Sequence, residues 1–293
     1  MASFHSNKIN PDRFSLSQLK FYLFLVSLSV FMILPIVFIV SQSLKPINEL
    51  FLYPPKFFAQ SPTLENFAQL FKVSDMSVVP KSKYLFNSLV VTVSVVFLSI
   101  AISSMTGFAL SKKKFKMKKV IFEVNIIALM FVPAAVTIPR YLIVEKLGLT
   151  DNLLGHILPM LALPVSVFLV KQFVDQIPDA LIEAAALDGA NDYYVFTKIV
   201  VPMIMPALAT VAILSFQMAW NNTETSALYM SKETLKTFAF YMSTLTTTTA
   251  MENNIAGQGM AAAAALLLFI PNLVIFIFMQ SKVMDTMAHS GLK

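Results

Sequence analysis

Residues 183–202 read EAAALDGANDYYVFTKIVVP and form a polar stretch between two long apolar segments. Just before it, Pro178 and Asp179 suit the first turn of a helix, because proline lacks an N–H that would be unpaired there and a negative charge favours the positive end of the helix dipole. Gly189 suits the left-handed turn that ends many helices, and Asn191 suits the cap of a second helix. The sequence therefore predicts a short helix, a turn at Gly189, and a second helix that runs to Pro202, the last residue of the stretch.

The composition is that of a membrane protein. Of the 293 residues, 57% are hydrophobic and 13% are charged, whereas a soluble domain has about 25% charged residues. A soluble core could not bury this much apolar surface, so we expect the bilayer to be the solvent. The net charge of +6 comes from Lys residues beside apolar segments, where they set topology rather than bind nucleic acid. With no Cys and three widely separated His, the sequence predicts neither a disulfide nor a metal site.

Six apolar segments are long enough to cross a bilayer, which takes roughly 20 residues in a helix. They cover residues 21–43, 84–110, 120–141, 152–174, 203–221 and 260–281. Prolines at positions 133, 139, 159 and 164 break the third and fourth segments. The predicted fold class is an all-α membrane protein with six transmembrane helices and a short helix outside the membrane between spans four and five.

Lysines set the predicted orientation. Residues 111–119 read SKKKFKMKK and carry six Lys with no acidic residue. Short Lys-rich loops lie on the cytoplasmic side of a membrane. Alternation of the spans then places both termini and residues 183–202 in the cytoplasm, and residues 44–83 outside.

Two polar segments are predicted to lie outside the membrane. The segment 44–83 is rich in proline, and we expect an ordered loop with a short helix at residues 64–71. Thr63 and Asn66 have the spacing of a capping box, with Asn where Glu or Gln is usual, so we expect them to cap that helix. The run of threonines at 244–249 is predicted to be another external loop.

Small residues recur at four-residue spacing in two spans, and such faces let helices approach closely in lipid. They are Ser99, Ser103 and Gly107 in the second span, and Gly257, Ala261 and Ala265 at the start of the last. We expect them to make contacts within one chain rather than an interface between subunits.

The polar stretch resembles a known motif. Gly189 follows Glu183 by six residues and Ile199 follows Gly189 by ten, and this spacing resembles the EAA loop in permease subunits of bacterial ATP-binding-cassette (ABC) importers. Further segments resemble the carbohydrate branch of that family, which includes maltose-type permeases. They are residues 62–71 (PTLENFAQLF), Asn87 with Ser88, residues 147–152 (LGLTDN), residues 177–190 (IPDALIEAAALDGA), Trp220 with Asn221, and residues 289–293 (HSGLK). Val201 stands where the family usually has Leu, and the sequence leaves the particular sugar open.

The resemblance implies a domain organisation and an assembly. Residues 1–20 form a cytoplasmic N-terminal segment, and residues 21–293 form one permease domain with an external loop at 44–83 and a coupling loop at about 175–202. Two permeases, the second expected to be a different chain, form the pore in the bacterial inner membrane. A cytoplasmic ATPase dimer binds ATP and Mg²⁺ and docks on the coupling loops, while an extracellular sugar-binding protein delivers substrate. The chain itself is then a multi-pass transporter subunit, in contact with membrane lipid, that binds no cofactor and is not an enzyme.

The motif also implies which residues couple the chain to the ATPase. They are Glu183, Ala184, Ala185, Asp188, Gly189, Ala190, Ile199 and Pro202. The Glu-Ala-Ala tripeptide alone would suit an ordinary link between two spans, but its spacing from Gly189, Ile199 and Pro202 favours coupling.

Polar side chains inside the spans are candidates for the substrate path, because such groups usually face a cavity or the bundle interior. The candidates are Asn125, Gln217, Trp220, Asn221 and Asn272. Hydrogen bonds between helices would explain Asn125, Gln217 and Asn272 equally well, and a position at the membrane interface would explain Trp220.

Other classes of function were compared with this one. The sequence has no GxxxxGK[ST], HExxH or GxSxG motif, so nothing in it indicates catalysis by this chain. An ABC permease for a non-sugar solute and a secondary transporter remain as alternatives. A six-span enzyme or signalling protein would have no reason to carry the spaced EAA pattern. A proton-coupled transporter would need acidic or His residues deep in the spans, and only Glu123 comes close.

Overall fold

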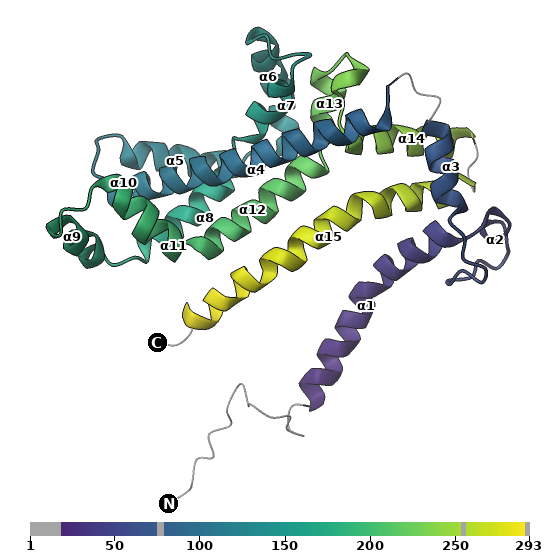
Figure 1. Cartoon of the computed structure of the whole chain (residues 1–293), viewed down its shortest axis with the longest axis horizontal. Coiled ribbons are helices and arrows are strands. Elements are labelled where there is room, and N and C mark those ends of the chain that lie inside the picture. Colours follow the sequence, from purple (N-terminus) through teal and green to yellow (C-terminus); the bar gives the residue numbers. More distant parts are fainter. Residues whose placement is uncertain (1–18, 75–78, 253–255, 291–293) are drawn as a thin grey trace, which may run out of the picture.

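The computed structural model describes residues 19–74, 79–252 and 256–290, and within these ranges the chain is helical with no strand (Figure 1). Most of the predicted N-terminal segment 1–20, and residues 291–293 of the C-terminal HSGLK, lie outside the described residues. In chain order the elements are α1 (Leu19–Leu44), α2 (Ile47–Leu50), α3 (Glu65–Ser74), α4 (Lys81–Lys112), α5 (Lys118–Leu129), α6 (Pro133–Lys146), α7 (Leu153–Met160), α8 (Pro164–Asp175), α9 (Asp179–Leu187), α10 (Asp192–Tyr194), the π-helical turn η2 (Val195–Val200), α11 (Val201–Met203), α12 (Met205–Trp220), α13 (Glu224–Tyr229), the 3₁₀ turn η3 (Glu233–Leu235), α14 (Phe238–Glu252) and α15 (Ala256–Ser290).

The apolar segments form three long helices and three bent pairs. Among the described residues, α1, α4 and residues Gly257–Gln280 of α15 are each long and apolar enough to cross a membrane. The bent pairs are α5 with α6 at 116°, α7 with α8 at 46°, and Asp192–Met203 with α12 at 77°. The described chain therefore has three such spans, or up to six if each bent pair counts as one.

Proline explains two of the bends. Pro133 begins α6 and Pro164 begins α8, because proline starts a helix readily but cannot donate a hydrogen bond inside one. The sequence analysis was therefore right about these breaks. Residues 120–141, predicted as one span, form the two helices α5 and α6, which lie at 116° to each other. Pro139 and Pro159, also predicted to break these segments, lie inside α6 and α7.

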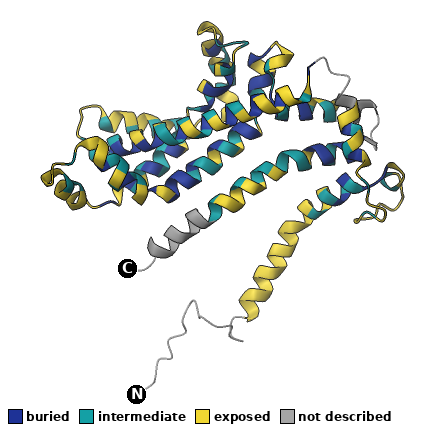
Figure 2. Cartoon of the chain, in the orientation of Figure 1, coloured by how far each residue is buried: buried dark blue, intermediate teal, exposed yellow. Residues whose placement is uncertain are grey.

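Helix α4 organises the bundle. It runs past α8 and α12 on one side of the molecule, while α1 packs against α15 (Figure 1). Its 32 residues contain no proline, so it is a continuous rod of about 48 Å. Most side chains of α1 are exposed (Figure 2), as expected of a helix whose surroundings are lipid.

The small-residue face of α4 packs inside the chain, as predicted. Ser99, Ser103 and Gly107 are buried, and a Cβ placed on Gly107 would lie 2.6 Å from Cγ1 of Val170 in α8. The prediction for α15 was only partly right. Gly257 is buried but Ala265 is exposed, and the fully buried small residues of that helix are instead Ala263 and Ala264.

The loop after α1 contains the predicted short helix, now α3, but its predicted cap is wrong. The amide of Asn66 donates to the carbonyl oxygens of Ser43 at 3.0 Å and Lys45 at 2.7 Å, at the end of α1. The Thr63 hydroxyl makes no hydrogen bond. The tertiary contact with α1 thus replaces the local capping box.

The predicted loop at 244–249 is also wrong, since these residues lie within α14. Thr244 and Thr247 donate their hydroxyl hydrogens to the carbonyls of Phe240 and Ser243, four residues earlier in the helix. Because the helix backbone itself satisfies these hydroxyls, a polar threonine run can be helical.

The close approach of α4 and α8 yields a first prediction. Gly107→Val should lower stability by about 1–3 kcal/mol, because it overpacks a contact that has no room for a Cβ. Thermal unfolding of the purified protein in detergent measures the change. The double variant Gly107→Val/Val170→Ala should recover part of the loss, and a Gly107→Val protein as stable as the wild type would contradict the packing.

Candidate functional site: the exposed helix α9 and its hinges

Helix α9 lies at one end of the bundle, between α8 and α10 in the chain (Figure 1). It begins at Asp179, directly after Pro178, and ends at Leu187, as the sequence predicted. We call residues 175–178 the first hinge and residues 188–191 the second hinge.

The second hinge has the geometry that was predicted for it. Gly189 has φ +83°, a left-handed conformation that favours glycine. The N–H of Gly189 donates to the carbonyl of Ala186 at 3.1 Å, and that of Ala190 donates to Ala185 at 2.9 Å. This pair of bonds is a Schellman motif, which satisfies the last carbonyls of a helix. Asn191 Oδ1 then accepts from the N–H of Tyr194 at 2.8 Å and caps the following helix.

One face of α9 packs on the bundle and the other is exposed. Ile182 and Ala185 contact the buried cluster formed by α4, α8 and residues 195–211. Glu183, Ala184 and Asp188 are exposed.

Large apolar side chains are exposed at the same place. Leu187 is 89% exposed, and Tyr193 and Tyr194, just beyond the second hinge, are also exposed. Exposed apolar side chains such as these are found at surfaces that meet another protein or a membrane.

The helix after the second hinge departs from the prediction of one regular helix ending at Pro202. It contains the π-helical turn η2, ends at Met203, and meets α12 at 77°. Prolines explain the break, because Pro202 and Pro206 each lack the N–H that would continue the helix. Ile199 lies half-buried in η2, and Pro202 is exposed at the bend.

The basic end of α4 contacts both hinges. Lys112 Nζ lies 2.6 Å from Asp179 Oδ1 and donates to the carbonyl of Ile177 at 2.6 Å. Lys113 forms an ion pair with Asp192. The Lys112 ammonium holds the pKa of the Asp179 carboxyl below its usual range through a hydrogen bond and through its charge.

Three of the predicted substrate-path residues lie together. The amide of Asn272 in α15 donates to Asn221 Oδ1 at 3.1 Å, and that of Asn221 donates to the carbonyl of Gln217 at 2.9 Å. Gln217 and Asn221 are exposed, and Asn272 is half-buried. The Gln217 carbonyl is that of the backbone, so the polar contact between α12 and α15 is made by the side-chain amides of Asn221 and Asn272.

The other two candidates lie apart from that site. Asn125 in α5 donates to the carbonyl of Pro164 at 3.1 Å, at the break between α7 and α8. Trp220 is buried, and its indole nitrogen donates to the carbonyl of Leu268 at 3.1 Å. Both side chains join helices in this structure, and their place in a substrate path stays a prediction.

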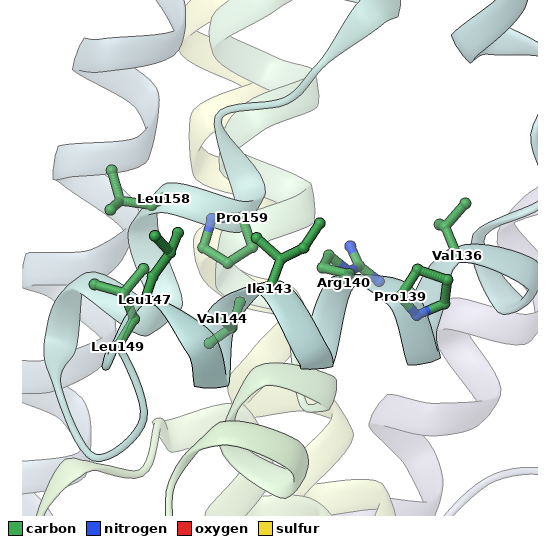
Figure 3. A pocket seen from close by; sticks show the side chains of 9 residues that line it. All are labelled: Val136, Pro139, Arg140, Ile143, Val144, Leu147, Leu149, Leu158 and Pro159. Carbon is green, nitrogen blue, oxygen red and sulfur yellow. The ribbon is translucent and has the colours of Figure 1, made fainter.

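The sequence analysis missed an ion pair between α6 and α13. Arg140 Nη2 lies 2.8 Å from Glu224 Oε1, and Arg140 also borders an apolar pocket of about 420 Å³ (Figure 3). The pocket is lined by Val136, Pro139, Arg140, Ile143, Val144, Leu147, Leu149, Leu158 and Pro159. A charged residue in a predicted span is costly unless it is paired or functional, and that rule could have singled out Arg140.

Comparison with known proteins defines the class. Residues 99–281, which include α9 and both hinges, match the family described as binding-protein-dependent transport system inner membrane component. The chain belongs to this family. It is thus a multi-pass membrane component of a transport system rather than an enzyme, as the sequence predicted.

Individual relatives align over nearly the whole chain. The chain is 27% identical over 290 residues to the arabinooligosaccharides transport system permease protein AraQ of Bacillus subtilis, covering 97% of this chain and 99% of the relative. It is 27% identical over 263 residues to the trehalose transport system permease protein SugB of Mycobacterium tuberculosis, covering 89% and 92%. A solved bacterial ABC transporter involved in the import of the acidic polysaccharide alginate contains a chain of the same fold, with a TM-score of 0.74, 21% identity, and coverage of 92% of this chain and 99% of that one.

The left-handed turn at Gly189 yields a second prediction. Gly189→Pro should destroy the second hinge, because proline requires φ near −65° and cannot donate to the Ala186 carbonyl. Gly189→Asn should keep it, since Asn tolerates the left-handed region. Limited proteolysis of the loop and solute uptake are measured on membranes that contain equal amounts of each variant. Normal uptake and normal protease resistance of Gly189→Pro would show that neither transport nor the loop structure requires the left-handed turn at Gly189.

Proposed function

We propose that the chain is the permease subunit of an ATP-driven importer of sugars or oligosaccharides and forms half of its pore. The observation that carries the proposal is α9, a capped and exposed helix at the position of the EAA motif in a member of this family. The substrate class rests on the relatives, whose names specify arabinooligosaccharides and trehalose. ATP and Mg²⁺ bind to a separate ATPase dimer and not to this chain.

In this proposal α9 seats in a groove of the ATPase. Glu183 offers a carboxylate to donors of the partner, and Ala184 lets the partner approach closely. The exposed side chain of Leu187 supplies apolar contact area at the end of the helix.

The hinge residues then carry the motion to the bundle. Asp188, Gly189 and Ala190 set the angle between α9 and the next helix, while Ala185 packs α9 on the core. Ile199 and Pro202 lie in the segment that leads into α12.

The proposal also covers the number of spans, the side of the membrane on which each loop lies, and the other subunits. Each bent pair counts as one span, which makes six, and both termini lie in the cytoplasm of a bacterial cell. The loop 44–83 faces an extracellular sugar-binding protein, and a second permease, a different chain, completes the pore. The ion pairs of Lys112 and Lys113 support this orientation, because they put the Lys-rich loop and α9 at the same end of the bundle.

The substrate path is proposed to pass the amides of Gln217, Asn221 and Asn272. Amide groups can donate to and accept from sugar hydroxyls. The side chains of Asn221 and Asn272 bond to each other, and Gln217 is exposed one helical turn before Asn221. For Asn125 and Trp220 to join the path, their bonds to backbone carbonyls would have to break.

The test of this function is a purification of the tagged chain in mild detergent from its native host, followed by mass spectrometry. The wild type should bring along an ATPase, a second permease and a sugar-binding protein, whose ligand would identify the substrate. Glu183→Lys should be inserted normally but recover little ATPase, because it reverses a charge on the exposed face of α9.

A matched variant separates coupling from substrate binding. Asn272→Leu should recover the ATPase at the wild-type level and lower uptake. Wild-type recovery of the ATPase and wild-type uptake by Glu183→Lys would contradict the coupling role. A binding protein whose ligand is not a sugar would favour the alternative of a permease for another solute.

The absence of cysteine from the chain allows a direct test of orientation. Tyr53→Cys, at a position 95% exposed in the loop after α1, should react with a membrane-impermeant maleimide in spheroplasts. Lys116→Cys, in the Lys-rich loop, should react only in inverted vesicles. The reverse pattern would place α9 on the wrong side of the membrane for a cytoplasmic ATPase.

A further inference from the structure

We propose that Lys112 and Lys113, at the end of α4, are positioning residues that fix both hinges of α9, so that α9 and α4 move as one body. This inference rests on the proposed coupling function of α9. It assigns to two lysines of the Lys-rich loop a mechanical role in addition to their effect on membrane topology.

The first hinge is held by a buried ammonium group. The Lys112 side chain is 9% exposed, and its Nζ lies 2.6 Å from both the Ile177 carbonyl oxygen and Asp179 Oδ1. Burial of a charge is costly unless it is paired and hydrogen-bonded. Lys112 therefore cannot leave these partners freely, and it binds the start of α9 to the end of α4.

A neighbouring bond holds the end of α8, where the first hinge begins. Ser111 Oγ donates to Asp175 Oδ1 at 2.6 Å, and Lys171 Nζ lies 2.6 Å from the other oxygen of the same carboxylate. Both sides of the first hinge are thus bonded to the last residues of α4.

Lys113, directly after α4, contacts the residue that follows the second hinge. Its ammonium pairs with Asp192, the first residue of α10, directly after the turn at Gly189 and Asn191. The three acidic residues that frame α9 are therefore bonded to residues 111–113, at the end of α4 and directly after it. The acidic residues are Asp175, Asp179 and Asp192.

Helix α4 can carry a displacement to the opposite end of the bundle. It has no internal proline, and its first turns are bonded to the segment before α14. Asn87 Nδ2 donates to the carbonyls of Thr234 at 2.8 Å and Lys236 at 3.0 Å, and Ser88 Oγ accepts from the N–H of Phe238 at 2.8 Å. A push on α9 that is passed to α4 thus reaches residues 234–238 through a continuous rod.

A reversible crosslink tests whether α9 and α4 move together. The variant Lys113→Cys/Asp192→Cys contains the only two cysteines of the chain and is joined by a short cleavable bismaleimide in the whole importer, reconstituted in liposomes. Solute uptake is measured in the same preparation before crosslinking, after it, and after cleavage. We expect the crosslink to form, and uptake after crosslinking to be at least as high as before it, because the crosslink replaces the ion pair that the two substitutions remove.

Two outcomes would overturn the proposal. If crosslinking stops uptake and cleavage restores it, α9 must move relative to α4 during transport. If no crosslink forms, the second hinge does not lie at the end of α4. Failure of the proposed function is distinguished separately, because the wild-type chain would then recover no ATPase.

Two variants that each remove one positive charge test whether the ammonium of Lys112 is needed at the first hinge. Lys112→Met keeps the length of the side chain and removes the ammonium, and Lys116→Met makes the same change at an exposed position of the same loop. Solute moved per ATP hydrolysed should fall about fivefold or more for Lys112→Met, the lower end of the usual range for coupling between sites. It should not change for Lys116→Met. Equal values for the two variants, at equal thermal stability, would refute the role of Lys112.

Discussion

Helices in lipid cannot leave backbone carbonyls unpaired, because the bilayer core offers no hydrogen-bond donor, and this constraint shapes the described bundle. At the break between α7 and α8, the amide of Asn125 donates to the carbonyl of Pro164. In α15, near Pro271, the carbonyl of Leu268 accepts from both Trp220 and Asn272. Polar side chains in the spans thus bond to backbone carbonyls and join neighbouring helices, and this is why a polar residue in a span does not by itself mark a substrate path.

The surroundings decide what an exposed apolar side chain means. On α1 the exposed residues cover a helix long enough to span a membrane, so lipid accounts for them. On α9 and just beyond it, Leu187 and Tyr193 lie in a polar segment with charged neighbours, where lipid does not account for them. Lipid therefore explains the exposed side chains on α1 but does not explain those on α9.

Charge at the end of α4 has two effects. Lysines in a short loop bias the orientation of the chain, and two of them also bond the acidic residues that frame α9. Because α4 is continuous and its other end is bonded to residues 234–238, the site that faces the proposed ATPase is linked to the far end of the bundle by one element. The broken helices α5 to α8 could not provide such a link.

What the sequence determined by itself was local. Pro178, Gly189 and Asn191 act on backbone groups within a few residues, so the start of α9, its left-handed turn and the next cap could all be predicted. The apolar segments and the breaks at Pro133 and Pro164 could be predicted for the same reason. Only the tertiary structure decided the bend angles, the partners of Asn66, and the bonds between residues 111–113 and the acidic residues that frame α9. These features depend on groups that are far apart in the sequence. The interactions that stabilise them form only when the helices pack.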